Sequence, residues 1–366
     1  MASIFLAFLS IYKLITTVAP DFSVLWLTTR DLLVGKNPYL NPEIFTGLGY
    51  PPHTLIFYVP LALLPYEIAQ VLFILFSFAS IVAVVFLSLK ISFEKIPWVY
   101  FLIAFPLSLL SFPTKFTLGM GQNNATAFLF LLISFFFYGK GGKKLSGVLL
   151  GLSAGLKPIL GFFLLFFLVK KEWKILLSAI STLLVLAIIT IFLPDINLYG
   201  FYFQKVVPPL LNPRGSEIYY NQGLLGFISR LNENLSLRRS LWELTSIALV
   251  SLTLLLTSKR GDKKLQFSLF VLALPLIDKL SWQHHFVWLI LPFVVLASYA
   301  VKIRKLWFWG LLIAAYLLAS WNFKNPELFQ EFPKSLLLSN TFYGTVILLG
   351  LNTYLLLKTK PTSLSQ

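Results

Sequence analysis

The chain has 366 residues, of which 57% are hydrophobic and only 12% charged, and its formal net charge is +16. A mean hydropathy of +0.81 excludes an ordinary soluble domain. The absence of cysteine excludes disulfides, thiol catalysis and cysteine-ligated metals. Long apolar runs, without the short alternating strands of a barrel, predict an all-α polytopic membrane protein.

Ten apolar segments are predicted to cross the membrane as helices, since a span needs about 20 apolar residues. In chain order they are 2–19, 67–89, 97–112, 123–139, 175–193, 240–257, 265–280, 285–301, 306–321 and 340–357. Segment 2–19 contains Lys13 and lacks both a basic start and a small-residue cleavage site. We therefore expect it to be a span rather than a signal peptide.

Segment 145–169 is apolar as well, but Gly155, Lys157 and Pro158 interrupt it midway. Because it lies between two basic loops, we expect a pair of short helices that enters and leaves on the same side, with Lys157 near the tip. Counting this pair as two gives about 10 to 12 crossings. No repeat of fixed period is present, so residues 1–366 are expected to form a single membrane domain.

Basic residues are concentrated in the short gaps between the predicted spans. More than half of the 30 lysines and arginines lie near 90–95, 140–144, 170–174, 259–264, 302–305 and 358–360. The positive-inside rule places these gaps and the short tail 358–366 in the cytoplasm, where they contact anionic membrane lipids rather than nucleic acid. The extracytoplasmic segments are then 20–66, 113–122, 194–239, 278–284 and 322–339, and the first of them has room for juxtamembrane helices.

The first extracytoplasmic loop, 20–66, begins with PDFSVLWLTTRDLLVGKNPY and places Asp21 at the membrane boundary. An aspartate at a helix start often caps backbone N–H groups. A carboxylate at this depth also suits a general base that receives a proton from a substrate hydroxyl. Asp31, beside Arg30, is the competing carboxylate, although such neighbour pairs are usually solvated surface features.

Five cationic or imidazole side chains are candidate ligands of a substrate phosphate. Lys279, His284 and His285 lie in DKLSWQHHFVWLILP, and Arg230 ends NQGLLGFISR. Lys157 stands inside an apolar segment, where it either faces a polar cavity or extends its ammonium to the interface. Adjacent helical residues point about 100° apart, so the two histidines are not expected to bind a metal.

Polar and aromatic residues of the outer segments are candidate ligands of a sugar or an acceptor. In LGMGQNNATAF, Gln122 and Asn123 are either helix caps or partners of sugar hydroxyls, because the third glycine of a dinucleotide motif is missing. The full set of sugar and acceptor candidates is Gln122, Asn123, Tyr39, Tyr50, His53, Asn221, Gln222 and Trp282.

An acid, several cations and many aromatics on one face suit sugar transfer from a lipid. Nucleotide sugars are cytoplasmic and no nucleotide-binding motif occurs, so we expect a polyprenyl-phosphate-linked donor and a glycolipid or glycan acceptor. A lone carboxylate favours an inverting single displacement with no metal and no cofactor. The alternatives are a transporter or flippase of a sugar or lipid-linked anion, and a ligase or polymerase of surface polysaccharide.

Several of these motifs, in their order and spacing, resemble glycosyltransferase family 87. They are DFSVLWLTTRDLLVGKNPY, YPP at 50–52, Pro60, Leu64-Pro65, GQNN at 121–124, Lys157-Pro158, NQGLLGFISR and WQHHFVWLILP, and they cover residues 20 to 300. The resemblance implies a GT-C-type bundle and a polyprenol-phosphate-mannose-dependent α-(1→2)-mannosyltransferase activity. It also implies that Asp21 is the catalytic base and that His284 and His285 approach the donor phosphate.

Overall fold

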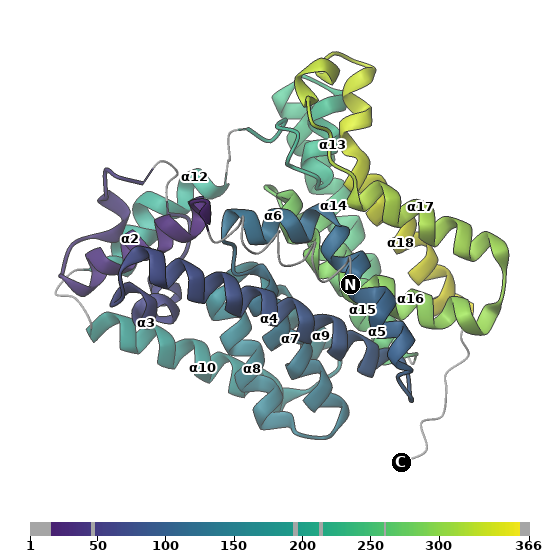
Figure 1. The fold of residues 1–366 in the computed structure, drawn as a ribbon, viewed down its shortest axis with the longest axis horizontal. Coiled ribbons are helices and arrows are strands. Elements are labelled where there is room, and N and C mark those ends of the chain that lie inside the picture. The colour runs from purple at the N-terminus through teal and green to yellow at the C-terminus, as the bar shows by residue number, and fades with distance from the viewer. Residues whose placement is uncertain (1–15, 45–47, 193–196, 212–214, 260, 359–366) are drawn as a thin grey trace. The chain divides into compact units, whose positions relative to one another are not determined.

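The computed structural model describes residues 16–44, 48–192, 197–211, 215–259 and 261–358. Within these ranges the regular secondary structure is helical, with one isolated β-bridge between Asn221 and Trp282, so the predicted all-α fold is confirmed (Figure 1). Most of the predicted first span, 2–19, and nearly all of the predicted tail, 358–366, lie outside the described residues.

The helices follow the predicted apolar segments closely. The α-helices are α2 (Pro20–Leu33), α3 (Val59–Ala62), α4 (Tyr66–Ser92), α5 (Trp98–Leu110), α6 (Phe112–Met120), α7 (Asn124–Gly139), α8 (Lys143–Leu156), α9 (Phe163–Val169), α10 (Trp173–Phe192), α11 (Leu198–Phe201), α12 (Val207–Leu211), α13 (Leu224–Leu231), α14 (Leu235–Ser258), α15 (Lys263–Ile277), α16 (Ile290–Ile303), α17 (Leu306–Ser320) and α18 (Asn340–Lys358). The 3-10 helices are η1 (Pro38–Leu40), η2 (Pro52–Tyr58), η3 (Pro158–Phe162), η5 (Gln283–Leu289), η6 (Pro326–Phe329) and η7 (Lys334–Ser339), and η4 (Tyr202–Val206) is a short π-helix.

Five helical segments in the described part of the chain are long and apolar enough to cross a membrane. They are α4, α10, α14, the continuous η5–α16 segment Gln283–Ile303 and the η7–α18 segment Lys334–Lys358. A sixth is obtained if α5 and α6, which meet at a bend of 63°, are counted as one span. The prediction of about 10 to 12 crossings also includes helices shorter than a full span of about 20 residues, such as α7, α8, α15 and α17.

The chain divides into two compact units. Unit 1 comprises Met1–Ala83, Thr117–Leu164 and Glu172–Pro213, and unit 2 comprises Val84–Phe116, Leu165–Lys171 and Arg214–Gln366. The helices α4, α6 and α9 contribute residues to both units. The single membrane domain that the sequence suggests stays a prediction.

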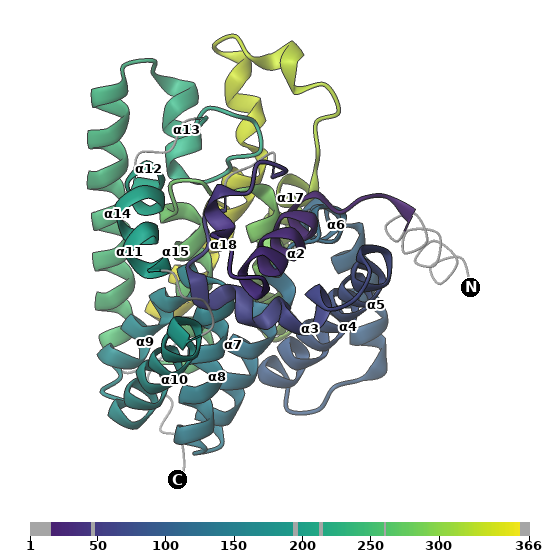
Figure 2. The ribbon, with the colours of Figure 1, turned by 90° about the vertical axis from the view of Figure 1, so that its left-hand side faces the viewer.

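At the centre of unit 1, α8 packs closely against α7 on one side and α10 on the other, and the three helices lie next to one another in Figure 2. Gly147, Gly151 and Gly155 stand at intervals of four along α8. A Cβ atom at Gly147 would lie 2.4 Å from Ile175 O, and one at Gly151 would lie 2.6 Å from Thr182 Cβ. Small residues at this spacing let membrane helices approach closely, so this face of α8 fixes the helix that ends just before Lys157.

The centre of unit 2 is α15, whose residues from Leu265 to Leu276 are all buried. It packs against α14, α16 and α18. Because α15 is buried on every side, the segment that follows it, from Asp278 to η5, starts from a fixed position. This segment carries the predicted pair His284 and His285.

Candidate active site

Asp21 occupies the first turn of α2, at a point where another segment of unit 1 approaches very closely. Gly121 has φ +69°, and a Cβ atom there would lie 2.7 Å from Phe22 Cβ and 2.8 Å from Ala19 Cβ. Only glycine combines this left-handed conformation with so close an approach. The next residue, Gln122, therefore reaches Asp21, and its Nε2 donates to Asp21 Oδ2 at 2.6 Å.

The same Gln122 side chain connects Asp21 to Lys157. Lys157 Nζ donates to Gln122 Oε1 at 3.1 Å and to the Tyr50 hydroxyl at 2.7 Å, and the Tyr50 hydroxyl in turn donates to Gln122 Oε1 at 3.3 Å. An ammonium only donates and a carboxylate only accepts, so the amide has one consistent orientation between them. The structure thus brings together Asp21, Gln122, Tyr50 and Lys157, four of the predicted site residues, which we name the Asp21 cluster.

Lys157 lies at the predicted break in segment 145–169. The helix α8 ends at Leu156, Lys157 itself is extended with φ −138° and ψ 94°, and Pro158 begins η3. Proline disfavours the helical conformation of the preceding residue, so the break follows from the sequence. The lysine is only 7% exposed, and its ammonium also lies 5.1 Å from the centroid of the Tyr50 ring. Of the two predicted alternatives, Lys157 faces a polar cluster inside unit 1.

Burial and charge act in opposite directions on Asp21. Burial raises the pKa of its carboxyl above the ordinary value, while the hydrogen bond from Gln122 and the positive charge of Lys157 lower it. Burial also keeps the pKa of the Tyr50 hydroxyl well above its usual range, so this phenol stays neutral. A carboxylate with a raised pKa is a stronger proton acceptor than an exposed aspartate, which suits a general base.

Asn123 and Asp31 have structural roles in unit 1. Asn123 makes no capping bond with its side chain but donates from Nδ2 to Leu156 O at 2.9 Å, which links the start of α7 to the end of α8. Asp31 lies ten residues after Asp21, about 15 Å farther along α2. Its Oδ2 accepts from Asn41 Nδ2 at 2.5 Å and thereby holds the loop after α2.

Tyr39 and His53 contact the helices α11 and η4 of the same unit. The Tyr39 hydroxyl donates to Tyr50 O at 2.9 Å, and the Tyr39 ring stacks on Phe201 at 5.9 Å between centroids. His53 Nδ1 lies 3.0 Å from the Tyr199 hydroxyl. Burial lowers the pKa of His53, which favours the neutral imidazole. Tyr39 therefore fixes the backbone of Tyr50, one residue of the Asp21 cluster.

Three of the predicted phosphate ligands, Lys279, His284 and His285, follow α15 in unit 2. His285 Nδ1 lies 3.5 Å from Asp278 Oδ2, and its ring stacks on Trp288. The His284 ring lies 5.5 Å from that of Phe116, and the two imidazoles are inclined by 82° to each other. Lys279 Nζ lies 4.8 Å from the centroid of the Trp242 ring. The described residues contain no group of three acidic, histidine or cysteine side chains that could hold a metal ion.

Asn221 and Gln222 bind backbone groups that surround this segment. Asn221 Nδ2 donates to Ser216 O and Lys279 O, and its Oδ1 accepts from Ser281 N. Gln222 Nε2 donates to Leu338 O, and its Oε1 accepts from Thr341 N. Trp282 forms the β-bridge with Asn221. These contacts hold the chain on either side of His284 and His285.

Arg230 also binds backbone oxygens. Its guanidinium donates to the carbonyl oxygens of Ile218, Tyr219 and Asn221 and to Ser339 Oγ. The side chain is 7% exposed, and burial lowers its pKa to about 10, so the arginine stays charged at neutral pH. In the structure Arg230 therefore binds backbone and hydroxyl oxygens of its own unit, and its role toward a phosphate stays a prediction.

Two features of the site are absent from the sequence-based candidates. Gln70, in the first turns of α4, accepts from Ala19 N at 2.9 Å and so fixes the residue that precedes α2. The glycine face of α8 positions Lys157. The sequence signal for Gln70 was a polar residue inside an apolar span, and the signal for α8 was the spacing of its glycines at every fourth residue.

The predicted residues are divided between the units. Asp21, Gln122 and Lys157 belong to unit 1, whereas Arg230, His284 and His285 belong to unit 2. That the two sets meet in one pocket stays a prediction.

Two curated mycobacterial proteins are similar to the chain, and both are named polyprenol-phosphate-mannose-dependent alpha-(1-2)-phosphatidylinositol mannoside mannosyltransferase. The protein of Mycolicibacterium smegmatis is 30% identical over 186 residues, 48% of this chain and 42% of that protein. The protein of Mycobacterium tuberculosis is 22% identical over 314 residues, 81% of this chain and 73% of that protein. The first alignment therefore spans less than half of that relative's length.

No solved structure matches the chain. The sequence matches the family model of glycosyltransferase family 87 over residues 48–277, more than half of the chain. The matched range contains Gln122, Lys157 and Arg230, while Asp21 and the histidine pair lie outside it. The chain, a membrane protein with several spans, belongs to glycosyltransferase family 87.

Proposed function

We propose that the chain is a mannosyltransferase that moves mannose from polyprenol-phosphate-mannose to a hydroxyl of a glycolipid acceptor of the phosphatidylinositol mannoside type. Family membership and the activity named for both relatives support this donor and acceptor class. The observation that carries the proposal is the Asp21 cluster, in which a partly buried carboxylate with a raised pKa is linked by one amide to a lysine.

In the proposed reaction Asp21 acts as a general base. Its Oδ2 accepts the Gln122 hydrogen bond, and the proposal assigns Oδ1 to the acceptor hydroxyl. As the acceptor oxygen attacks the anomeric carbon, its proton passes to Asp21. The bond between this carbon and the phosphate oxygen breaks, and polyprenyl phosphate leaves with the electron pair. A single displacement of this kind inverts the anomeric configuration.

The leaving phosphate carries the charge that develops in this step. Cationic donors aimed at such a group stabilise the transition state more than the ground state. The proposal assigns this role to Lys157 together with His284 and His285, and it places the reaction on the extracytoplasmic face. Arg230 and the pair Asn221 and Gln222 then act by holding the chain around the histidines.

The test compares the native chain with Asp21→Asn in lipid vesicles that contain radiolabelled polyprenyl-phosphate-mannose and a phosphatidylinositol mannoside. We expect transfer by the native chain without added divalent metal, and a loss of about three orders of magnitude in the variant, within the range for removal of a general base. Asp31→Asn is the matched control and is expected to keep nearly full activity.

Equal turnover by the native chain and Asp21→Asn would reject Asp21 as the base. No transfer by either protein, combined with sugar flux across sealed vesicles, would support a transporter instead.

A further inference from the structure

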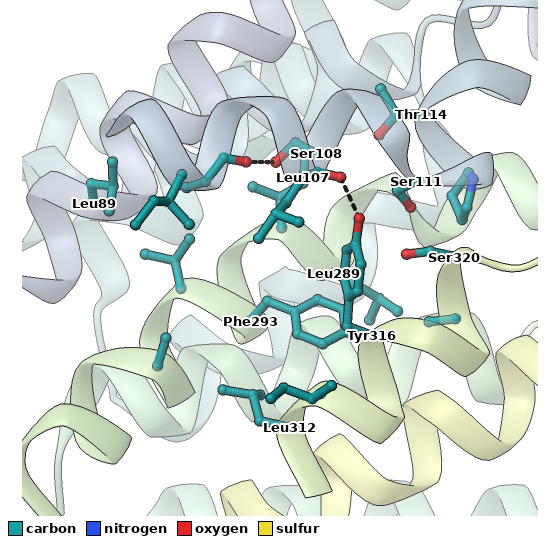
Figure 3. A pocket seen from close by; sticks show the side chains of 18 of the residues that line it. Leu89, Leu107, Ser108, Ser111, Thr114, Leu289, Phe293, Leu312, Tyr316 and Ser320 are labelled. Atoms are coloured by element: carbon teal, nitrogen blue, oxygen red, sulfur yellow. Dashed lines mark hydrogen bonds between the residues drawn. The ribbon is translucent and has the colours of Figure 1, made fainter. Parts of the chain in front are cut away.

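Unit 2 contains a large apolar cavity to which the proposed reaction assigns no role. Its volume is about 520 Å³, and its walls are the C-terminal end of α4, most of α5, the η5–α16 segment and α17 (Figure 3). This volume lies within the range of roughly 300–1,000 Å³ that ligand sites usually have. Cavities of this size and polarity in a membrane protein suit a hydrocarbon chain.

Three hydroxyl side chains of the lining lie near one end of the cavity. Ser111, Thr114 and Ser320 stand together in Figure 3, and Leu89 marks the opposite end. The basic residue Lys90 follows Leu89 in the last turn of α4, so the positive-inside rule places the Leu89 end of the cavity at the cytoplasm and the hydroxyl end toward the outer face. A lipid bound here has its head at the hydroxyl end and its tail in the membrane.

The histidine pair lies next to residues that line the cavity. Phe286 and Val287 line the cavity and belong to η5, the same short helix that carries His284 and His285. Thr114 also lines the cavity, and Phe116, two residues farther on, contacts the His284 ring at 5.5 Å. A phosphate held by these imidazoles therefore has the mouth of an apolar cavity next to it.

We propose that this cavity holds the part of the donor's polyprenyl chain that is nearest to the phosphate. This inference rests on the proposed function, which supplies a polyprenyl-phosphate donor. In such a donor the phosphate is bonded directly to the first isoprene unit, so the hydrocarbon must begin within a bond or two of the phosphate site. In a phosphatidylinositol mannoside, by contrast, the inositol phosphate and the glycerol separate the reacting sugar from the acyl chains, so an acyl chain begins much farther from the reacting groups.

The walls of the cavity are held apart by a defined contact. The Tyr316 hydroxyl of α17 donates to Leu107 O of α5 at 2.9 Å, as the dashed line in Figure 3 shows. Tyr316 and Leu107 both line the cavity. The bond fixes the spacing of α5 and α17, so the space between them is a property of the fold.

The experiment uses the full chain in vesicles with a polyprenyl phosphate that carries a photoreactive diazirine in its first isoprene units and no sugar. After irradiation, labelled peptides are mapped by mass spectrometry. We expect labels on α5, α16 or α17 that excess unlabelled polyprenyl phosphate removes. Labels elsewhere in the chain, or labels that excess phosphatidylinositol removes equally well, would overturn the proposal.

Variants that fill the cavity sharpen the test. Ala104→Phe and Ala297→Phe place a ring in the space, because both alanines line it. Leu102→Phe is the matched control, since Leu102 lies on α5 outside the lining and is 67% exposed. We expect the two alanine variants to reduce labelling about tenfold and the control to keep it. Undiminished labelling of both alanine variants would contradict the proposal, and the native label map remains decisive if a variant fails to fold.

The outcomes separate this inference from the proposed function, because labelling needs no sugar transfer. Transfer of mannose together with labels outside the cavity would reject the cavity and leave the function intact. Labels inside the cavity without transfer of mannose would reject the function.

Discussion

Gln122 is the residue on which the organisation of the Asp21 cluster depends. Its amide donates to Asp21 with one end and accepts from Lys157 with the other. Hydrogen bonds to a partly buried carboxylate favour its ionised form, and Gln122 supplies one that lowers the pKa of Asp21 against the effect of burial. The neutral amide therefore influences the base without contributing charge.

This role predicts a pH effect for Gln122→Leu. Loss of the hydrogen bond raises the pKa of Asp21 further, so the ionised base is present only at higher pH. We expect the acid limb of the kcat/KM profile to move to higher pH by about one unit, because a hydrogen bond to a charged group contributes about 1.5 kcal/mol and 1.36 kcal/mol corresponds to one pKa unit. The profile is measured from about pH 4 to 9, and the control is Gln330→Leu, which replaces an exposed glutamine that follows η6 in unit 2. An acid limb at the native position would show that Gln122 does not set this pKa.

Arg230 allows a second prediction at the same scale, because its donors are directed at backbone carbonyl oxygens. In Arg230→Met, Asn221 O loses this donor at a cost of about 1–3 kcal/mol for a buried acceptor left unpaired, whereas Ile218 O and Tyr219 O keep bonds from Asn221 N and Gln222 Nε2. We expect a thermal midpoint lower by several degrees, measured by fluorescence in detergent. An unchanged midpoint with a raised KM for the donor would instead support the predicted phosphate role.

The predictability of the site residues differs for a physical reason. Asp21, Gln122 and Lys157 could be predicted because placing a charged or amide side chain in or near a membrane costs free energy, which marks such residues as functional candidates. The partners of Gln222, by contrast, could not be read from local sequence. Gln222 Nε2 donates to Leu338 O, 116 residues away, and only the folded chain shows that its donors are occupied by backbone.

At the scale of helices, α8 shows how packing positions a functional residue. The glycines at 147, 151 and 155 leave no room for a side chain against α10. The break at Lys157 comes two residues after the last of them. A displacement of α8 along α10 would therefore move the ammonium relative to Gln122.

Gly151→Ala is expected to disturb this packing. Its added Cβ would lie 2.6 Å from Thr182 Cβ and 2.7 Å from Ala179 O, so α8 and α10 must separate. We expect a thermal midpoint lower by several degrees and reduced transferase activity. Gly350→Ala in α18 is the matched control, because nothing lies within 4 Å of its added Cβ and alanine favours helix by about 1 kcal/mol. Equal behaviour of the two variants would disprove close packing at Gly151.

The sequence predicted most helices but not the structure of every connection. The break at Lys157 was predicted because glycine and proline flank it. Residues 113–122 were expected only as an extracytoplasmic segment, yet α6 runs from Phe112 to Met120. Pro113 is compatible with the first turn of a helix, where its missing N–H needs no partner. Proline thus ends one helix and begins another, and its effect depends on its position.

At the scale of the whole molecule, the orientation in the membrane is open to a direct test because the chain has no cysteine. Single cysteines can be placed at exposed positions in either unit, at Lys36 and Glu217 for the predicted outer face and at Lys144 for the cytoplasmic face. We expect a membrane-impermeant maleimide to label Lys36→Cys and Glu217→Cys in intact cells. Lys144→Cys is expected to react only after permeabilisation. The reverse labelling pattern would show that the predicted topology is wrong and that the proposed active face lies in the cytoplasm.

The cavity of unit 2 has a consequence for how the rate depends on the membrane itself. Its walls include η5–α16, a segment long enough to cross the bilayer. A donor whose tail enters such a site arrives by lateral diffusion and never passes through water. Its occupancy is then set by its mole fraction among the surrounding lipids, so adding inert phospholipid at a fixed amount of donor slows transfer even though the bulk concentration is unchanged.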